Sequence, residues 1–285
     1  MSEPGGTVRG FLFEDLDIRG SVVRLGDAWR AMHAGRGYAA PLRELLGQMA
    51  AVGALIGADL KAPGRLTFQL QGHGPISLLV VGCDERLRLR GMARAAADLP
   101  VAPLARLFGD GRLAMTLQYD GSEPYQSLVP IEGDSVAAVF EAYLAQSQQQ
   151  PARLWLSADD EGAAALFLQA LPDAGDKDAD GWNRVQRLAE TLRAGDLALP
   201  AELLLTRLFA GEAVRLFDAR TVSYHCPRDE DRVRAMLAGL GRDEVEAIVA
   251  AHGGVVVRDE ICNQEYRFGA TIIDELFGAP ARTLH

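Results

Sequence analysis

The sequence predicts an α+β protein with an N-terminal mixed α/β core domain, a helical linker region and a small C-terminal α+β module. Helical and period-two apolar patterns alternate without a regular order, and an acidic, glycine-rich segment at residues 172–181 interrupts them. The 285 residues suffice for about two folding units. We therefore expect a core domain over residues 1–171, an acidic linker and helical middle segment over 172–220, and the module over 221–285.

The first long element is a helix over residues 41–60, where apolar side chains recur every three or four positions. Residues 66–71 then alternate apolar and polar side chains, which is typical of a half-buried strand. A turn at residues 72–75 leads to an apolar run that predicts a strand at 76–81. Further strands are expected at residues 87–92, 113–117 and 125–129, and a helix at 135–146. Because these elements lack a βαβ rhythm, the pattern favours α+β over a doubly wound sheet.

The second half of the chain opens on the linker segment and continues with helical patterns at residues 182–192 and 200–209. The acidic run at residues 229–231 is typical of the first turn of a helix. The module is expected to hold two helices and two strands, at residues 233–240, 245–249, 255–257 and 266–268.

The charge balance excludes several classes of partner. The chain carries 29 basic and 39 acidic residues, a net charge of −10, which argues against a surface that neutralises nucleic acid or anionic lipid. The N-terminus lacks the pattern of a signal peptide, so we expect a cytoplasmic protein without a membrane partner. Neither a phosphate-binding GxxxxGK[ST] motif nor a GxSxG motif occurs, and an enzyme is not expected.

The three cysteines are Cys83, Cys226 and Cys262, too few for a secreted disulfide framework. Cys83 follows an apolar run and is interpreted as an ordinary strand-end thiol. His73 lies in a glycine-rich turn without a neighbouring nucleophile or carboxylate pair, and His252 precedes two glycines as the last residue of a helix would. We therefore predict no catalytic residues.

The C-terminal cysteines stand in a pattern that resembles a metal module with half of its ligands replaced. Residues 224–228 read Tyr-His-Cys-Pro-Arg and residues 259–262 read Asp-Glu-Ile-Cys. This pattern resembles the redox-regulated thirty-three-kilodalton heat-shock chaperones, in which a C-x-C pair and a C-x-x-C pair bind zinc. Cys226 falls on the first position of the first pair and Cys262 on the last position of the second. Arg228 and Asp259 stand in the places of the two inner cysteines.

The resemblance covers essentially the whole chain. It rests in the first domain on residues 9–13, 18–20, 67–75, 90–94, 125–126 and 131–134. It implies an ATP-independent holdase chaperone that binds unfolding client proteins under heat or oxidative stress, commonly as a homodimer, with residues 1–171 as the substrate-binding core domain. In typical members, oxidation forms two disulfides, releases zinc, and unfolds the C-terminal module and the linker region before it.

The replaced positions leave two interpretations of the former metal site. If zinc is bound after all, its ligands are expected to be Cys226, Cys262 and Asp259, since His225 would project the other way from an extended segment. A guanidinium at Arg228 cannot ligate a cation and repels it, so we predict no cofactor. We expect instead that Arg228 and Asp259 form an ion pair in place of the metal. The alternative is that both are solvated surface residues.

The two remaining cysteines, Cys226 and Cys262, are the redox and disulfide candidates. Their disulfide would close a loop of about 36 residues, so oxidation should stabilise the module rather than unfold it. A competing interpretation is a nucleic-acid or ribosome-binding module with a worn zinc ribbon. Residues 221–285 hold 7 Arg against 11 acidic residues, which is the wrong sign for binding phosphate. The sequence therefore favours a holdase with a degenerate redox and zinc switch.

Overall fold

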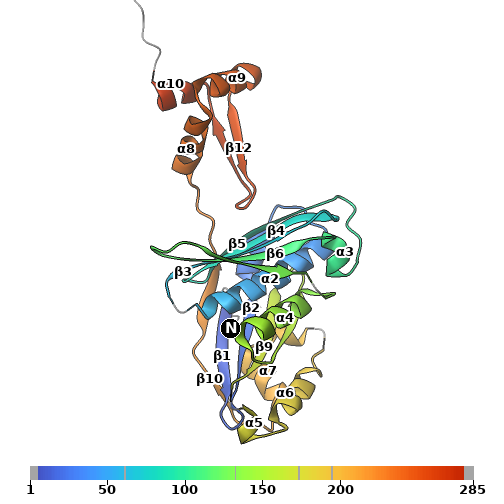
Figure 1. Cartoon of the computed structure of the whole chain (residues 1–285). Helices are drawn as coiled ribbons and strands as arrows, with labels where there is room; N and C mark the ends of the chain where they lie inside the picture. Colours follow the sequence, from blue (N-terminus) through green and yellow to red (C-terminus); the bar gives the residue numbers. More distant parts are fainter. Residues whose placement is uncertain (1–5, 61, 132, 173, 194, 279–285) are drawn as a thin grey trace, which may run out of the picture. The chain divides into compact units, whose positions relative to one another are not determined.

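A computed structural model describes residues 6–60, 62–131, 133–172, 174–193 and 195–278 (Figure 1). The chain forms two compact units, the first ending at His225 and the second beginning at Cys226. Within the described residues, none of the helices combines the length and apolar character that a membrane crossing requires.

The first unit is built on a sheet of eleven strands in the described part of the chain. Its order is β7-β6-β3-β4-β5-β11-β1-β2-β9-β8, and β10 pairs with β1. Neighbouring strands are antiparallel except β11 and β5, which are parallel. The strands are β1 Gly6–Phe13, β2 Ile18–Leu25, β3 Gly64–Gln71, β4 Ile76–Asp84, β5 Arg88–Ala95, β6 Arg112–Tyr119, β7 Tyr125–Pro130, β8 Ala152–Ala158, β9 Ala163–Ala170, β10 Val214–Leu216 and β11 Arg220–Tyr224.

The helices of this unit cover the sheet. They are α1 Asp27–His33, α2 Ala40–Ala58, α3 Leu104–Phe108, α4 Val136–Gln148, α5 Ala174–Lys177, α6 Gly181–Ala189 and α7 Ala201–Leu208, with a 3-10 turn at Asp196–Ala198. Each helix and strand that the sequence predicts in this unit is present, with ends shifted by a few residues.

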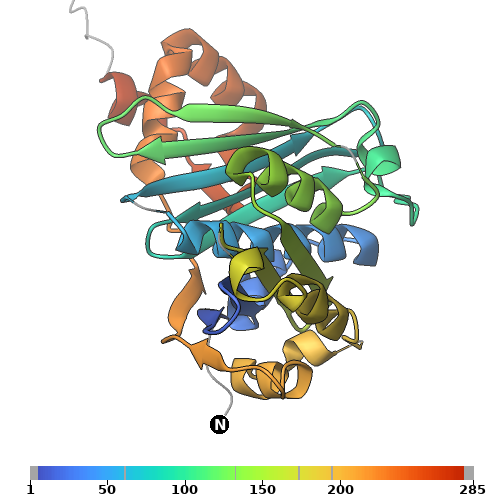
Figure 2. The same ribbon diagram turned by 60° about the horizontal axis from the view of Figure 1, so that its bottom comes forward.

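The long helix α2 organises the main core. It contacts β4 and β5 in one half of the sheet and β8 and β9 in the other, and Figures 1 and 2 show it in blue along the cyan and green strands. A Cβ atom on Gly57 would lie 2.6 Å from the sulfur of Cys83, so the helix packs directly on β4 only because this position has no side chain. In the same core, the rings of Phe68 on β3 and Phe140 on α4 meet edge to face, with their centroids 4.9 Å apart.

The segment predicted as a linker belongs to the first unit. The apolar faces of α6 and α7 form a second core with β1, in which the rings of Phe13 and Phe209 lie 4.9 Å apart. Within the expected linker, Ala174 is buried and the Lys177 ammonium bonds the Asp17 carboxylate at 2.7 Å. Residues 172–220 therefore do not form a separate region, because their apolar side chains pack on the sheet. The buried acidic residue Asp196 is paired with Arg207 at 2.7 Å.

The boundary of the C-terminal module also differs from the expected start at residue 221. The strand β11 pairs with β1 and β5, and Val222 is fully buried in the main core. The backbone N–H of His225 still donates to the carbonyl of Leu89 at 2.9 Å. The second unit therefore begins only at Cys226.

The second unit is a small α+β module. It contains α8 Glu230–Leu240, α9 Arg242–His252, the hairpin of β12 Val255–Asp259 and β13 Gln264–Phe268, and α10 Ile272–Phe277. The predicted helix start is confirmed, since the Asp229 carboxylate caps α8 by accepting from the N–H of Arg232 at 2.9 Å. The predicted helix end at His252 is confirmed by a left-handed Gly253 that follows it.

Candidate redox site

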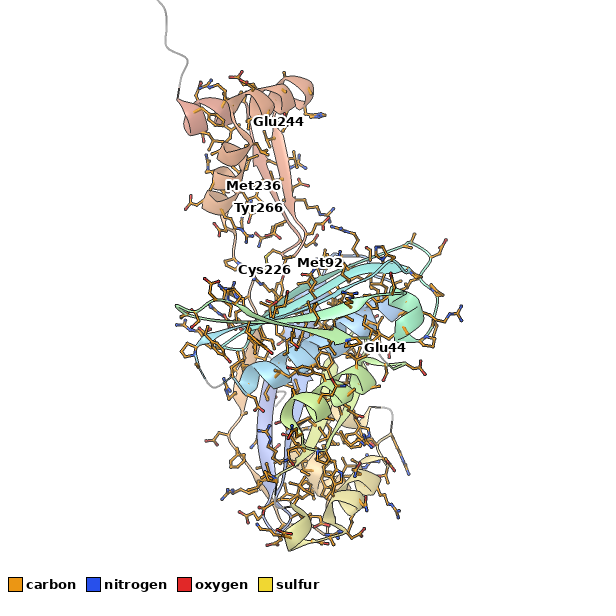
Figure 3. All side chains as sticks on the ribbon, viewed as in Figure 1. Glu44, Met92, Cys226, Met236, Glu244 and Tyr266 are labelled. Atoms are coloured by element: carbon orange, nitrogen blue, oxygen red, sulfur yellow. A yellow bond between two sulfur atoms is a disulfide. The ribbon has the colours of Figure 1, made fainter. Side chains whose placement is uncertain are left out.

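The two cysteines of the second unit form a disulfide in the structure. Their Cα atoms lie 5.4 Å apart across a sequence separation of 36 residues. Cys226, labelled in Figure 3, begins the unit ahead of α8, and Cys262 lies in the turn between β12 and β13. Both residues are half-buried. The bridge therefore joins the segment that leads into α8 to the tip of the hairpin.

The carboxylate of Asp259 shapes the turn that carries Cys262. Its Oδ1 atom accepts hydrogen bonds from the N–H of Ile261 at 2.9 Å and of Cys262 at 3.1 Å. Such an Asx turn fixes the backbone that follows it, and Asn263 next in the chain adopts a left-handed φ of 51°. Asp259 is thus a positioning residue for the cysteine.

The expected ion pair between Arg228 and Asp259 is not formed. Among the described residues, no contact of 4.0 Å or less joins their charged atoms. The Arg228 guanidinium lies 4.6 Å from the centre of the Tyr266 ring and donates to the carbonyl of Glu265 at 3.1 Å. It also approaches the Glu230 carboxylate at 3.8 Å. A planar cation stacks on an aromatic face while donating at its edge, and the Asp259 oxygen is already used by the turn.

The Tyr266 side chain connects the same two segments from inside the module. Its ring is buried, and its hydroxyl accepts from the N–H of Asp229 at 3.0 Å and donates to the Gln264 side-chain oxygen at 3.1 Å. The Gln264 amide in turn donates to the carbonyl of Cys226 at 2.6 Å. These bonds satisfy polar groups that burial would otherwise leave without partners.

We call this set of contacts the clasp. It comprises the disulfide, the stacking of Arg228 on Tyr266, and the hydrogen bonds from Gln264 to Cys226, from Arg228 to Glu265 and from Asp229 to Tyr266. The clasp links residues 226–229 to the hairpin at several points. It includes Cys226, Cys262 and Arg228, which are three of the four positions where the resemblance places the cysteines of a metal module.

The residues at these four positions do not fit a zinc ion. The two sulfurs are bonded to each other and are not thiolates, and the Asp259 oxygen accepts two backbone hydrogen bonds. The fourth position holds Arg228, whose guanidinium is a permanent cation and cannot be a ligand. In the ranges that the structure describes, no group of three or more His, Cys, Asp and Glu side chains is arranged to hold a metal. The set of Cys226, Cys262 and Asp259 would ligate only after reduction of the disulfide and rotation of the carboxylate.

The other side chains singled out in the sequence lie apart from this site. Cys83 is buried in β4, and desolvation raises the pKa of its thiol to about 12, which keeps it protonated and unreactive. The imidazole of His73 lies 2.8 Å from the Asp110 carboxylate on exposed loops and holds the pKa of that carboxyl below its usual range. His225 belongs to the first unit through its backbone.

The fold and the site define the class of the protein. It is an α+β protein in which a large sheet domain is followed by a small helix and hairpin module closed by a cysteine pair. Residues 6–269 match the family model described as Hsp33 protein, a family of heat-shock chaperones. The chain belongs to the Hsp33 family, which confirms the resemblance stated from its sequence.

Several curated relatives agree with this assignment, and a solved structure shares the fold. Proteins named 33 kDa chaperonin from Nitrosococcus oceani and Chromobacterium violaceum are 41% and 40% identical, each over 94% of this chain and 92% of the relative. The one from Ectopseudomonas mendocina is 38% identical over 96% of this chain and 98% of its own length. The crystal structure of the Thermotoga maritima 33 kDa chaperonin superposes with a TM-score of 0.83 at 20% identity, covering 96% of this chain and 98% of that one. This likeness confirms the predicted α+β fold.

The sequence did not indicate a role at this site for Gln264, Glu265, Tyr266 or the backbone N–H of Asp229. The N–H of Asp229 donates to the Tyr266 hydroxyl across a sequence separation of 37 residues, and that hydroxyl donates to the Gln264 side chain. The period-two spacing of Gln264 and Tyr266 placed both side chains on one strand face and was the only local signal for their contact.

Proposed function

We propose that the chain is an ATP-independent holdase that binds unfolding proteins under heat or oxidative stress. The observation that carries this proposal is the family match over residues 6–269, which spans both units. Client proteins in the cytoplasm are the partners that this function needs, and a homodimer is the assembly that we expect from the resemblance.

Exposed apolar side chains support the proposal, because a holdase must offer apolar surface to its clients. On the edge strand β7, Tyr125 is 63% exposed and Leu128 is 59% exposed. In the second unit, Met236 and Leu240 on α8 and Val256 on β12 are about half-exposed, and Figure 3 labels Met236. An edge strand that bears such side chains can accept an extended chain.

We further propose that this module needs no zinc and that oxidation stabilises it. The clasp joins residues 226–229 to the hairpin without a metal, and its disulfide runs between the two former cysteine pairs rather than within either pair. A bridge of this kind restricts the unfolded state of the module and so favours the folded one. Exposure of the client-binding surface then depends on heat or is present at rest.

The test is suppression of light scattering from a heat-unfolding client enzyme in the absence of ATP. It is run with the oxidised protein, the reduced protein and a Cys226→Ser, Cys262→Ser variant, beside an equal mass of an unrelated acidic protein. We expect suppression in all three forms of the protein and none in the control. Scattering that is unaffected in every redox state would refute the holdase proposal.

A further inference from the structure

The outer edge of β1 is covered along its length by a single extended segment, residues 214–224, which we call the strap. Its first part, β10, pairs Leu216 with Phe11, and its second part, β11, pairs Val222 with Gly6. Between them the N–H of Phe217 donates to the carbonyl of Gly10 at 2.9 Å. In Figure 1 the strap is the orange segment beside β1.

The end of the strap also closes a gap in the sheet. Ser223 and Tyr224 pair in parallel with Arg88 and Leu89 of β5, while the preceding residues pair with β1. The order β5-β11-β1 means that no direct pairing joins β5 to β1 within the described residues. Without the strap, both strands would present an unpaired backbone edge.

Little apolar surface holds the strap in place. Of its residues, all within the described ranges, only Val222 is fully buried, while Val214, Leu216 and Tyr224 are half-buried. Phe217 in its middle is 44% exposed. A segment with one buried side chain and mostly exposed neighbours is the kind that opens locally before the surrounding structure unfolds.

Polar anchors hold the strap at three points. At the first, the Arg215 guanidinium lies 3.4 Å from the Glu14 carboxylate. The Arg220 guanidinium donates to the carbonyl of Ala58 at the end of α2, at 2.7 Å, and to that of Glu85 at 3.4 Å. Arg9 of β1 donates to the carbonyl of Phe217 at 3.1 Å. Because Arg220 belongs to the strap, its hydrogen bonds break when the strap opens. The carbonyls of Ala58 and Glu85 can then accept hydrogen bonds from water.

We propose that the place of the strap is a docking site for an extended segment of an unfolding protein that carries one aliphatic side chain, and that this segment pairs as a strand with β1 and β5 when the strap opens. This inference rests on the proposed holdase function and gives it a binding mode. Backbone pairing is nearly independent of sequence, as a protein with many clients requires. The buried position of Val222 adds a preference for a β-branched aliphatic side chain at one point of the bound segment.

The occupant follows from the chemistry that the strap itself displays. We call the space between β1 and β5 that the strap fills the slot. The side chains on either side of Val222 are the exposed Thr221 and Ser223, so the slot requires one apolar side chain and tolerates polar neighbours. Unfolding proteins expose extended backbone together with aliphatic side chains, most of which are buried in folded proteins.

A labelled peptide with the sequence of residues 214–224 is the direct probe of this site. A second peptide carries Asp in place of the residue that corresponds to Val222. Binding is measured by fluorescence anisotropy on the full chain, on a Val222→Ala variant, and on a Ser223→Ala variant as the matched exposed control. The strap competes with the peptide for the slot. The Val222→Ala substitution weakens the strap and leaves the strand edges of β1 and β5 unchanged.

We expect Val222→Ala to bind the first peptide roughly tenfold more tightly than the unaltered chain, the factor that loss of buried methyl groups from the competing strap would give. Ser223→Ala should match the unaltered chain, and the Asp peptide should bind none of the three. Equal binding by the Val222→Ala variant and the unaltered chain, or equal binding of the two peptides, would overturn the inference.

A covalent lock tests whether clients use the same slot. Thr7 and Thr221 face each other across β1 and β11, so cysteines at both positions can join the strap to the sheet. The lock is placed in a Cys226→Ser, Cys262→Ser background, so that reductant acts on the lock alone, with the Thr221→Cys single variant as control. All three tryptophans lie in the first unit, and their fluorescence verifies that it is folded.

We expect the oxidised lock to abolish peptide binding and to weaken client protection several-fold, and reductant to restore both. Client protection that persists in the locked chain would place the client site elsewhere and overturn this inference while the holdase proposal stands. Absence of protection in every variant would refute the holdase proposal, and the peptide titration would still decide whether the slot accepts a strand.

Discussion

Removal of the disulfide is the perturbation whose size the structure sets most directly. The bridge spans 36 residues of a module that begins at Cys226. For a loop of that length, the chain-entropy relation gives a stabilisation of about 4 kcal/mol. The module has a small apolar core, formed by Val233, Leu237, Val245, Val255, Tyr266 and Ile272. A contribution of this size is therefore a large part of its stability.

We expect the paired Cys226→Ser, Cys262→Ser variant, or the reduced protein, to remain folded in its second unit but to unfold roughly 15–30 °C lower. The remaining hydrogen bonds of the clasp and the small core account for the residual stability. The assay is hydrogen exchange over residues 226–278 as a function of temperature, with and without reductant. Exchange in the first unit serves as the internal reference.

The serine variant is the matched control, because it should reproduce the reduced protein and be insensitive to reductant and oxidant. Faster exchange of residues 226–278 in the oxidised protein than in the reduced one would refute the reasoning. Identical exchange in the two states would also refute it, since the bridge would then add no stability.

Three further measurements test the former metal site, the role of Arg228 and the state of the Cys83 thiol. Chelators should leave the thermal transition of the reduced protein unchanged, and metal analysis after reducing purification should find no stoichiometric zinc. Arg228→Ala should lower the free energy of unfolding of the second unit by about 1 kcal/mol in denaturant titration, through loss of its stacking and hydrogen bond, whereas Arg232→Ala at an exposed position should change it by less than about 0.5 kcal/mol. The pKa of Cys83 is raised to about 12 in the folded state, so the stability that depends on its neutral thiol should be complete below about pH 9 and decline as pH rises toward 12. A Cys83→Ala variant should lack this decline when unfolding is measured at stepped pH. An equal alkaline decline in both proteins would contradict the assignment.

The local elements could be predicted from the sequence because their signals are local. Helix α2 and strand β3 show apolar periods of 3.6 and 2, and each is present with nearly the expected ends. Strand β9 was missed, since its sequence AAALFLQA is buried on both faces and therefore has no alternation. Its alanines also favour a helix when only local preference is considered.

The non-local features could not be predicted. The strap pairs with β1 across more than two hundred residues, and no local pattern marks which strand edge it covers. The same limit applies at the clasp. The sequence indicated that Arg228 faces the hairpin. Whether its guanidinium pairs with Asp259 or stacks on the Tyr266 ring depends on where the turn directs the Asp259 carboxylate. The cysteine pairing was accessible because only one disulfide is possible at this site.

We propose that oxidation stabilises the module and does not activate the chaperone. The most direct measurement follows client aggregation and hydrogen exchange over residues 226–278 in the same samples, before and after oxidant. We expect slower exchange on oxidation, with holdase activity that is no higher than in the reduced protein. Faster exchange together with activity that appears only after oxidation would contradict it and show that the unfolding switch operates with two cysteines.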